Sequence, residues 1–348
     1  MTMEVIYHFV PYGEVLVPEK DTFALDVGMK TVPGVIDHHH PEAEPECTAS
    51  LLVKHPELIF NHLDPAEFAR RRPQERRIKI ITHRLPDFDA VASIFICLKL
   101  LETGQVDPYL EEIAVYTRMV DSASLPKSLD LTATPYSILR AIFASLKKEG
   151  DEGNFERIEE GLRLMHFLYT KSEEGYDIID NRTLFAAVDR YEKAMKRVEE
   201  DYFQYLLELE KFPKLSLYLP SVSGDKKILV DGLICRNPKS FLLREWARRD
   251  RNNSPHGEGF GFLLTAFGHH RYILGVDPDR GVNLKGLGDL LNQKEEEKRK
   301  SLNRPMTYRW YDGNCPFFNY RIIDSPQDGP ALSFQEIVRL VIQFGSSK

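Results

Sequence analysis

The chain of 348 residues is long enough for two packed domains, and it carries 46 basic and 53 acidic residues, a net charge of −7. No apolar run approaches the ~18 residues that span a bilayer, and we expect no signal peptide at the first residues. The four cysteines form no Cys-x-x-Cys pair, which favours a reduced, cytoplasmic protein over a disulfide-rich secreted one.

Short apolar runs, separated by glycine and proline, predict strands of a sheet within residues 4–10 and 22–37. The last run, residues 35–36, ends in an aspartate and three consecutive histidines at residues 37–40. Three adjacent imidazoles cannot share one face of a strand or helix, so we expect them at a strand end, where they can line a cleft. Because imidazole and carboxylate are common ligands of divalent transition metals, this cluster predicts half of a metal site. A polar surface turn or a fragment of an affinity tag is the alternative for the histidines alone.

Residues 48–54 and 65–72 are expected to be helical, and five arginines follow between residues 70 and 77. Such a basic cluster is typical of a solvated helix end, where cations complement the helix dipole. Its alternative role is the attraction of a polyanionic substrate.

A second apolar, β-branched run at residues 78–82 predicts a buried strand, followed by a loop and a helix that extends to Leu101. The loop contains His83, Asp87 and Asp89, which offer one nitrogen and two oxygen donors to adjacent ions. An isolated Asp-x-Asp pair is usually a solvated loop or a helix cap. Together with the cluster at residues 37–40, it indicates a metal centre.

The second half of the chain divides into a helical segment and a mixed segment. From residue 135 to 212, apolar side chains recur at helical spacing, and residues 191–212 form a long charged helix that would join two domains. Residues 225–321 then alternate strands with shorter helices, and a helix at 334–344 follows, which predicts a separate α+β domain. Residues 225–321 hold 18 Lys/Arg and 12 Asp/Glu, so they carry +6 and leave −13 for the remainder. A basic domain suits a phosphorylated substrate, because Arg and Lys bind phosphate oxygens.

Two of these stretches resemble motifs of the DHH phosphoesterase superfamily. Residues 83–93, His-Arg-Leu-Pro-Asp-Phe-Asp-Ala-Val-Ala-Ser, resemble its first motif, and residues 36–39, Ile-Asp-His-His, resemble its third, which gives the family its name. Asp26 is similar to the lone aspartate of the second motif, and Asp121 to that of the fourth. Residues 46–52 are similar to a small Ser/Thr segment that follows the DHH triplet. The resemblance covers roughly the first 125 residues.

The family includes manganese-dependent inorganic pyrophosphatases, exopolyphosphatases, oligonucleotide and cyclic-dinucleotide phosphodiesterases, and RecJ-like single-strand exonucleases. The motif order in this chain is rearranged: second, third, first, fourth, instead of first to fourth. Ligands of an open parallel sheet gather at the carboxyl ends of neighbouring strands. We therefore expect a strand–helix unit to have moved within the sheet while the cleft keeps its geometry.

The resemblance implies an α/β fold with three parts. Residues 1–185 would form a DHH-like catalytic domain, with a parallel sheet and helices on both faces. Residues 186–212 would form a helical linker, and residues 213–348 a smaller α+β substrate-binding domain.

The resemblance also implies two divalent ions, expected to be Mn²⁺, with Mg²⁺ or Co²⁺ as alternatives. Six residues would hold them, with His83 and Asp87 on one ion, Asp89, His38 and Asp121 on the other, and Asp26 bridging.

For catalysis, the resemblance places His39 beside the scissile phosphate, with Asp37 orienting a neighbouring imidazole. A loose similarity to the glycine–histidine loop of the family's C-terminal domains makes three further residues candidate substrate contacts, namely His269, His270 and Arg271.

We therefore expect a metal-dependent phosphohydrolase that cleaves a phosphoester or phosphoanhydride bond of a nucleotide or another small phosphorylated substrate. One alternative is an exonuclease or phosphodiesterase of single-stranded oligonucleotides, whose strand would bind along the basic segment at residues 225–321. Another is a non-catalytic metal- and nucleotide-binding protein, which the displaced motif and the weak C-terminal match favour. So many candidate ligands in one chain favour the hydrolase. The sequence does not predict the oligomeric state.

Overall fold

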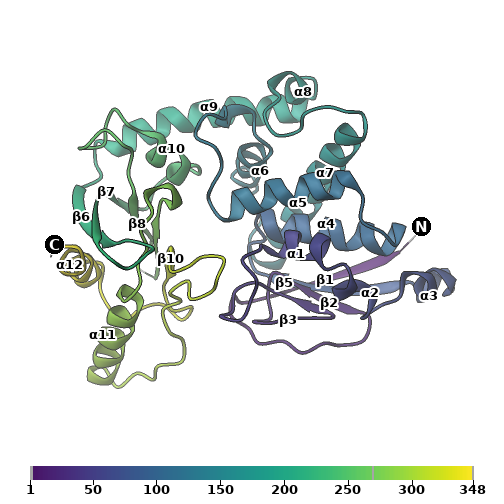
Figure 1. Ribbon diagram of the computed structural model, residues 1–348, viewed down its shortest axis with the longest axis horizontal. Helices are drawn as coiled ribbons and strands as arrows, with labels where there is room; N and C mark the ends of the chain where they lie inside the picture. Colours follow the sequence, from purple (N-terminus) through teal and green to yellow (C-terminus); the bar gives the residue numbers. More distant parts are fainter. Residues whose placement is uncertain (1–2, 269, 347–348) are drawn as a thin grey trace. The chain divides into compact units, whose positions relative to one another are not determined.

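The computed structural model describes residues 3–268 and 270–346 and divides the chain into two compact units (Figure 1). Unit 1 comprises Met1–Val198 with Cys315–Phe317, and unit 2 comprises Glu199–Asn314 with Phe318–Lys348. Each unit contains a five-stranded sheet and several helices, so the predicted α/β class is confirmed. No helix among the described residues is long and apolar enough to cross a membrane.

The sheet of unit 1 has the strand order β1-β5-β2-β4-β3. Its strands are β1 (Glu4–Val10), β2 (Thr22–Leu25), β3 (Thr31–Val32), β4 (Val35–Ile36) and β5 (Arg77–His83). β1, β5, β2 and β4 run parallel, and the short β3 pairs antiparallel with β4 at the edge. The central strands β2 and β5 are largely buried, as is typical of a parallel sheet whose faces are covered.

β5 lies between β1 and β2, although about fifty residues separate it from β2 in the chain. Its register places Ile81 opposite Ala24 of β2 and His83 opposite Val10 of β1. Because β2, β4 and β5 are parallel, their carboxyl ends lie at the same edge of the sheet. β5, which ends at His83, thus lies beside β2, the strand that precedes Asp26.

The helices of unit 1 are grouped around α4. Figure 1 shows α1, α4 and α5 over one face of the sheet. The helices are α1 (Thr48–Lys54), α2 (Glu57–Phe60), α3 (Pro65–Arg70), α4 (Phe88–Thr103), α5 (Pro108–Asp121), α6 (Pro135–Phe143), α7 (Gly150–Glu173), α8 (Arg182–Ala186) and the first part of α9 (Asp189–Leu209). Residues on all sides of α4 are buried, because α1, α5 and α7 pack against it. The helix predicted at 48–54 is present with the same ends. The helix predicted at 65–72 ends at Arg70, and the one predicted to extend to Leu101 ends at Thr103.

The sheet of unit 2 has the order β10-β9-β8-β7-β6, with β7 and β8 parallel and the other pairs antiparallel. Its elements are β6 (Lys214–Pro220), β7 (Lys227–Arg236), α10 (Leu243–Arg249), β8 (Phe262–Phe267), β9 (Arg271–Val276), α11 (Leu287–Ser301), β10 (Ile322–Asp324) and α12 (Phe334–Gly345). Phe262, Leu274 and Trp310 belong to its apolar core, together with residues of α11 and α12.

The α4–α7 contact depends on a glycine. A Cβ atom built on Gly161 of α7 would lie 2.4 Å from Cγ1 and 2.7 Å from Cγ2 of Val91 on α4. Val91 is fully buried and β-branched, so its side chain cannot rotate away without a new clash. The absence of a side chain at Gly161 thus sets how closely α7 approaches the helix that carries Asp89.

We predict that Gly161→Ala lowers the free energy of unfolding by about 1–2 kcal/mol, because the overpacking cost exceeds the gain in helix propensity. In a Val91→Ala background, the same substitution should be neutral or stabilising, since the clash is gone and the propensity gain remains. Urea denaturation of the four proteins of this double-mutant cycle measures both effects. Equal effects of Gly161→Ala in the two backgrounds would contradict the close contact.

Candidate metal centre

The carboxyl ends of three parallel strands and the ends of two helices bring together the side chains predicted to bind metal. Asp26 follows β2, residues 37–39 follow β4, and His83 ends β5. Asp87 caps the amino end of α4 and Asp89 lies in its first turn, while Asp121 is the last residue of α5. These segments supply three groups of possible ligands, namely Asp26, Asp37, His38 and His39; Asp26, His83 and Asp87; and His38, Asp89 and Asp121.

In one group, His83 faces two carboxylates through a single nitrogen. Its Nε2 atom lies 3.2 Å from Oδ2 of Asp26 and 3.8 Å from Oδ1 of Asp87. Its Nδ1 atom lies 2.9 Å from the carbonyl oxygen of Arg84, which can only accept a hydrogen bond. A neutral His83 therefore carries its proton on Nδ1 and directs the Nε2 lone pair at the carboxylates, as a metal ligand does.

In a second group, His38 lies between two carboxylates. Its Nδ1 atom is 3.7 Å from Oδ2 of Asp89, and its Nε2 atom is 3.3 Å from Oδ2 of Asp121. The Oδ2 atom of Asp121 is buried and accepts no hydrogen bond from the described residues. A buried carboxylate oxygen without a donor is unfavourable unless a cation compensates it, so this group fits a divalent metal.

Asp26 connects the two groups. Its Oδ2 atom faces His83, and its Oδ1 atom lies 3.6 Å from Nδ1 of His38. Asp26 adopts a left-handed backbone conformation with φ 60°, which is uncommon for a residue other than glycine and is found at functional sites. All six residues expected to bind metal thus lie together, and Asp26 lies between the two predicted sets.

Backbone amides fix the Asp89 carboxylate. The amides of Thr48 and Ala49, in the first turn of α1, each donate a hydrogen bond of 2.9 Å to one of its oxygens. Burial raises the pKa of Asp89 to about 8, and the nearby carboxylates of Asp26 and Asp87 add to this effect. Burial likewise raises the pKa values of Asp26 and Asp121. The centre therefore has excess negative charge when these groups ionise, which a cation would compensate.

The Thr48 hydroxyl lies 3.2 Å from Oδ1 of Asp26 and 3.2 Å from Nδ1 of His38. Sequence reasoning assigned this residue no role, although residues 46–52 resembled a family segment. The hydroxyl and backbone amide of Thr48 contact three candidate ligands, so the first turn of α1 positions the centre.

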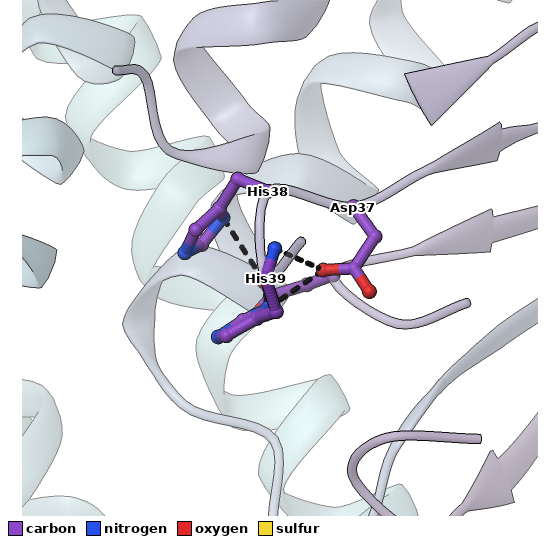
Figure 2. Close-up of side chains that lie close together, drawn as sticks. Asp37, His38 and His39 are labelled. Carbon is purple, nitrogen blue, oxygen red and sulfur yellow. Dashed lines mark hydrogen bonds and ion pairs between the residues drawn. The ribbon is translucent and has the colours of Figure 1, made fainter. Parts of the chain in front are cut away.

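Asp37 and His39 form a close pair beside the centre (Figure 2). Oδ1 of Asp37 accepts hydrogen bonds from Nδ1 of His39 at 2.6 Å and from its backbone amide at 3.1 Å. Its Oδ2 atom accepts a 2.7 Å hydrogen bond from the amide of Met29. Burial lowers the pKa of His39, but the Asp37 carboxylate outweighs this effect and holds the pKa well above its usual value. The imidazole that Asp37 orients is thus His39.

The candidate substrate contacts belong to unit 2. Arg271 begins β9 and forms an ion pair of 3.1 Å with Asp324 of β10. His270 immediately precedes β9, and His269 lies outside the described residues.

The arginine cluster lies at the amino end of β5, opposite the end where His83 lies. Three of its members form ion pairs, Arg71 with Asp21, Arg72 with Glu75 and Arg77 with Glu4. This placement favours the helix-end interpretation over attraction of substrate toward the metal centre.

We predict that protein stripped of metal by a chelator becomes less stable as the pH rises from about 6.5 to 8. In the folded protein the pKa of Asp89 is raised to about 8 and that of His83 to about 10, whereas the unfolded chain has the ordinary, lower values. The folded state therefore binds more protons in this range, and each extra proton lowers the free energy of unfolding by up to about 1.4 kcal/mol per pH unit.

Thermal melts at several pH values, with chelator and with Mn²⁺, measure this dependence. Mn²⁺ should raise the Tm most at pH 8, where protons compete least for the ligands. Asp89→Asn should make the Tm of the metal-stripped protein less dependent on pH, and it should reduce the rise in Tm that Mn²⁺ causes. An unchanged pH dependence in this variant would show that Asp89 is not the titrating group.

In comparisons with family models, curated proteins and solved structures, nothing matches this chain. The case for a metal centre therefore rests on the groups of buried imidazoles and carboxylates described above. Their donor chemistry fits divalent cations that accept mixed nitrogen and oxygen ligands.

Proposed function

We propose that this protein is a metal-dependent phosphohydrolase of the DHH type, which cleaves a phosphoester or phosphoanhydride bond. The observation that supports this most directly is the position of Asp26 between two groups of imidazole and carboxylate ligands. Two adjacent metal groups with a shared carboxylate are typical of hydrolases that act on phosphate bonds.

One divalent cation would be held by His83 and Asp87, and a second by His38, Asp89 and Asp121, with Asp26 shared. Mn²⁺ suits this mixture of imidazole and carboxylate donors, and Mg²⁺ or Co²⁺ are the alternatives. When bound, such a pair of cations lowers the pKa of water and polarises a phosphoryl group. The chain's own residues fix the ligand positions, because backbone amides of α1 hold Asp89 and the Arg84 carbonyl sets the tautomer of His83.

The Asp37–His39 pair supplies a proton donor beside this centre. Nδ1 of His39 is committed to Asp37, so its Nε2 atom is the nitrogen that can face a substrate. The Asp37 carboxylate holds the pKa of His39 above its usual value, which favours the protonated imidazole. An imidazolium in this place would donate a hydrogen bond to a phosphoryl oxygen, or a proton to the leaving oxygen.

We predict that Asp89→Asn lowers metal-dependent turnover by at least about 100-fold, since it removes an anionic ligand from the centre. The assay uses metal-stripped protein with and without Mn²⁺, on bis-p-nitrophenyl phosphate, pyrophosphate and a short labelled oligonucleotide. Asp64→Asn is the matched control, because asparagine can also cap α3 and Asp64 lies at an exposed helix start. Full activity of Asp89→Asn would refute the assignment. Turnover of the oligonucleotide alone, at a rate that falls steeply as the salt concentration rises, would favour the nuclease alternative.

We predict that Asp37→Asn lowers kcat by about 10- to 100-fold and moves the alkaline limb of its pH profile to lower pH. The reason is that His39 loses the carboxylate that holds its pKa above the usual value, so it gives up its proton at a lower pH. The pH dependence of kcat between pH 6 and 10 measures the shift. His40→Asn serves as the control and should leave the limb in place; an unmoved limb in Asp37→Asn would exclude His39 as the proton donor.

A further inference from the structure

Tyr12 lies against the metal centre, although no sequence feature singled it out. It is half-buried in the loop that follows β1. Its ring stacks on His83, with centroids 4.0 Å apart and planes at 22°, and lies edge-on to His39 at 6.1 Å. Its hydroxyl lies 3.0 Å from Nε2 of His83. Tyr12 thus contacts one candidate metal ligand and the proposed proton donor at the same time.

The backbone holds Tyr12 in this place. In the parallel register of β1 and β5, Val10 lies opposite His83, and the amide of Arg84 donates a 2.9 Å hydrogen bond to the Val10 carbonyl. Tyr12 follows Val10 by two residues, so its position is tied to the strand end that carries His83. The backbone therefore keeps Tyr12 near the centre whether or not His83 binds a cation.

The Tyr12 hydroxyl and a metal cation would compete for the same nitrogen of His83, since the hydroxyl lies within hydrogen-bond distance of Nε2. The Nδ1 atom of His83 is committed to the Arg84 carbonyl, so Nε2 is the only nitrogen with which His83 can bind a cation. Once a cation binds there, the hydroxyl can no longer share a hydrogen bond with Nε2. The hydroxyl, which lies beside both His83 and His39, would then be able to donate to an oxygen of a molecule bound at the centre.

We propose that Tyr12 is a substrate-binding residue whose hydroxyl donates a hydrogen bond to a phosphoryl oxygen of the substrate. This inference rests on the proposed function and adds a neutral donor to the cationic His39. A phenol suits this role, because it donates readily to an anionic oxygen and its stacked ring fixes the position of the hydroxyl oxygen. The ligand is any tetrahedral phosphate held by the two cations, and inorganic phosphate is the simplest probe.

Tyr12→Phe tests the inference, because it removes the hydroxyl and keeps the ring that stacks on His83. Calorimetric titration of Mn²⁺-loaded protein with inorganic phosphate should give a Kd about 10-fold higher than in the parent protein. The affinity for Mn²⁺ itself, measured separately, should change by less than about 3-fold. Tyr176→Phe is the matched control, since Tyr176 lies half-exposed against Lys171 and should leave phosphate affinity unchanged.

Unchanged phosphate affinity in Tyr12→Phe, or no phosphate binding to the parent protein, would overturn the inference. Weaker Mn²⁺ binding in Tyr12→Phe would overturn it too, because it would show that the hydroxyl is a metal ligand. The failure of the proposed function looks different: the Mn²⁺-loaded parent would bind phosphate but hydrolyse no member of the substrate panel. The phosphate titration would still decide the role of Tyr12 in that case.

Discussion

The crowding of carboxylates at one edge of a parallel sheet is the constraint on which the rest of unit 1 depends. Asp26, Asp89 and Asp121 are largely buried, and burial raises the pKa of each. Mutual repulsion of their charges opposes the fold unless protons or cations compensate it. The surrounding backbone holds the groups together despite this cost, through the α1 amides on Asp89 and the Met29 amide on Asp37. A structure stabilised only by apolar packing has no need of such an arrangement.

The sheet topology explains how residues that are far apart in the sequence form one compact site. In a parallel sheet the position of a strand end is set by hydrogen-bonded neighbours, and not by the place of the strand in the chain. β5 lies between β1 and β2, which places His83 next to Asp26 although 57 residues separate them. The segment that follows β4 reaches the same edge from the other side of β2. Proximity in space, rather than order in sequence, therefore defines the ligand set.

Local patterns located most of the helices and strands but not the whole site. Apolar runs ending in polar residues located β5 and the strand before residues 37–40, and helical spacing located α1 and α12. Periodicity gave no indication of the two-residue β3, which pairs antiparallel at the edge of the sheet. Asp121 was identified only through the family resemblance, because its position depends on how α5 packs beside α4. Tyr12 has no local signal at all, since its contact with His83 arises from the register of two strands distant in sequence.

The two candidate metal groups differ in their access to solvent. The side chain of Asp87 is 47% exposed, whereas that of Asp89 is 1% exposed and lies against the first turn of α1. Asp87 also uses one oxygen to cap its own helix, accepting a hydrogen bond from the amide of Ala90. Exchange of a metal ligand needs solvent access, so Asp87 makes its group the more accessible of the two to water. Tyr12 lies at this more open group, where its ring stacks on His83, so the proposed hydrogen bond to a phosphate would not require the displacement of a buried ligand.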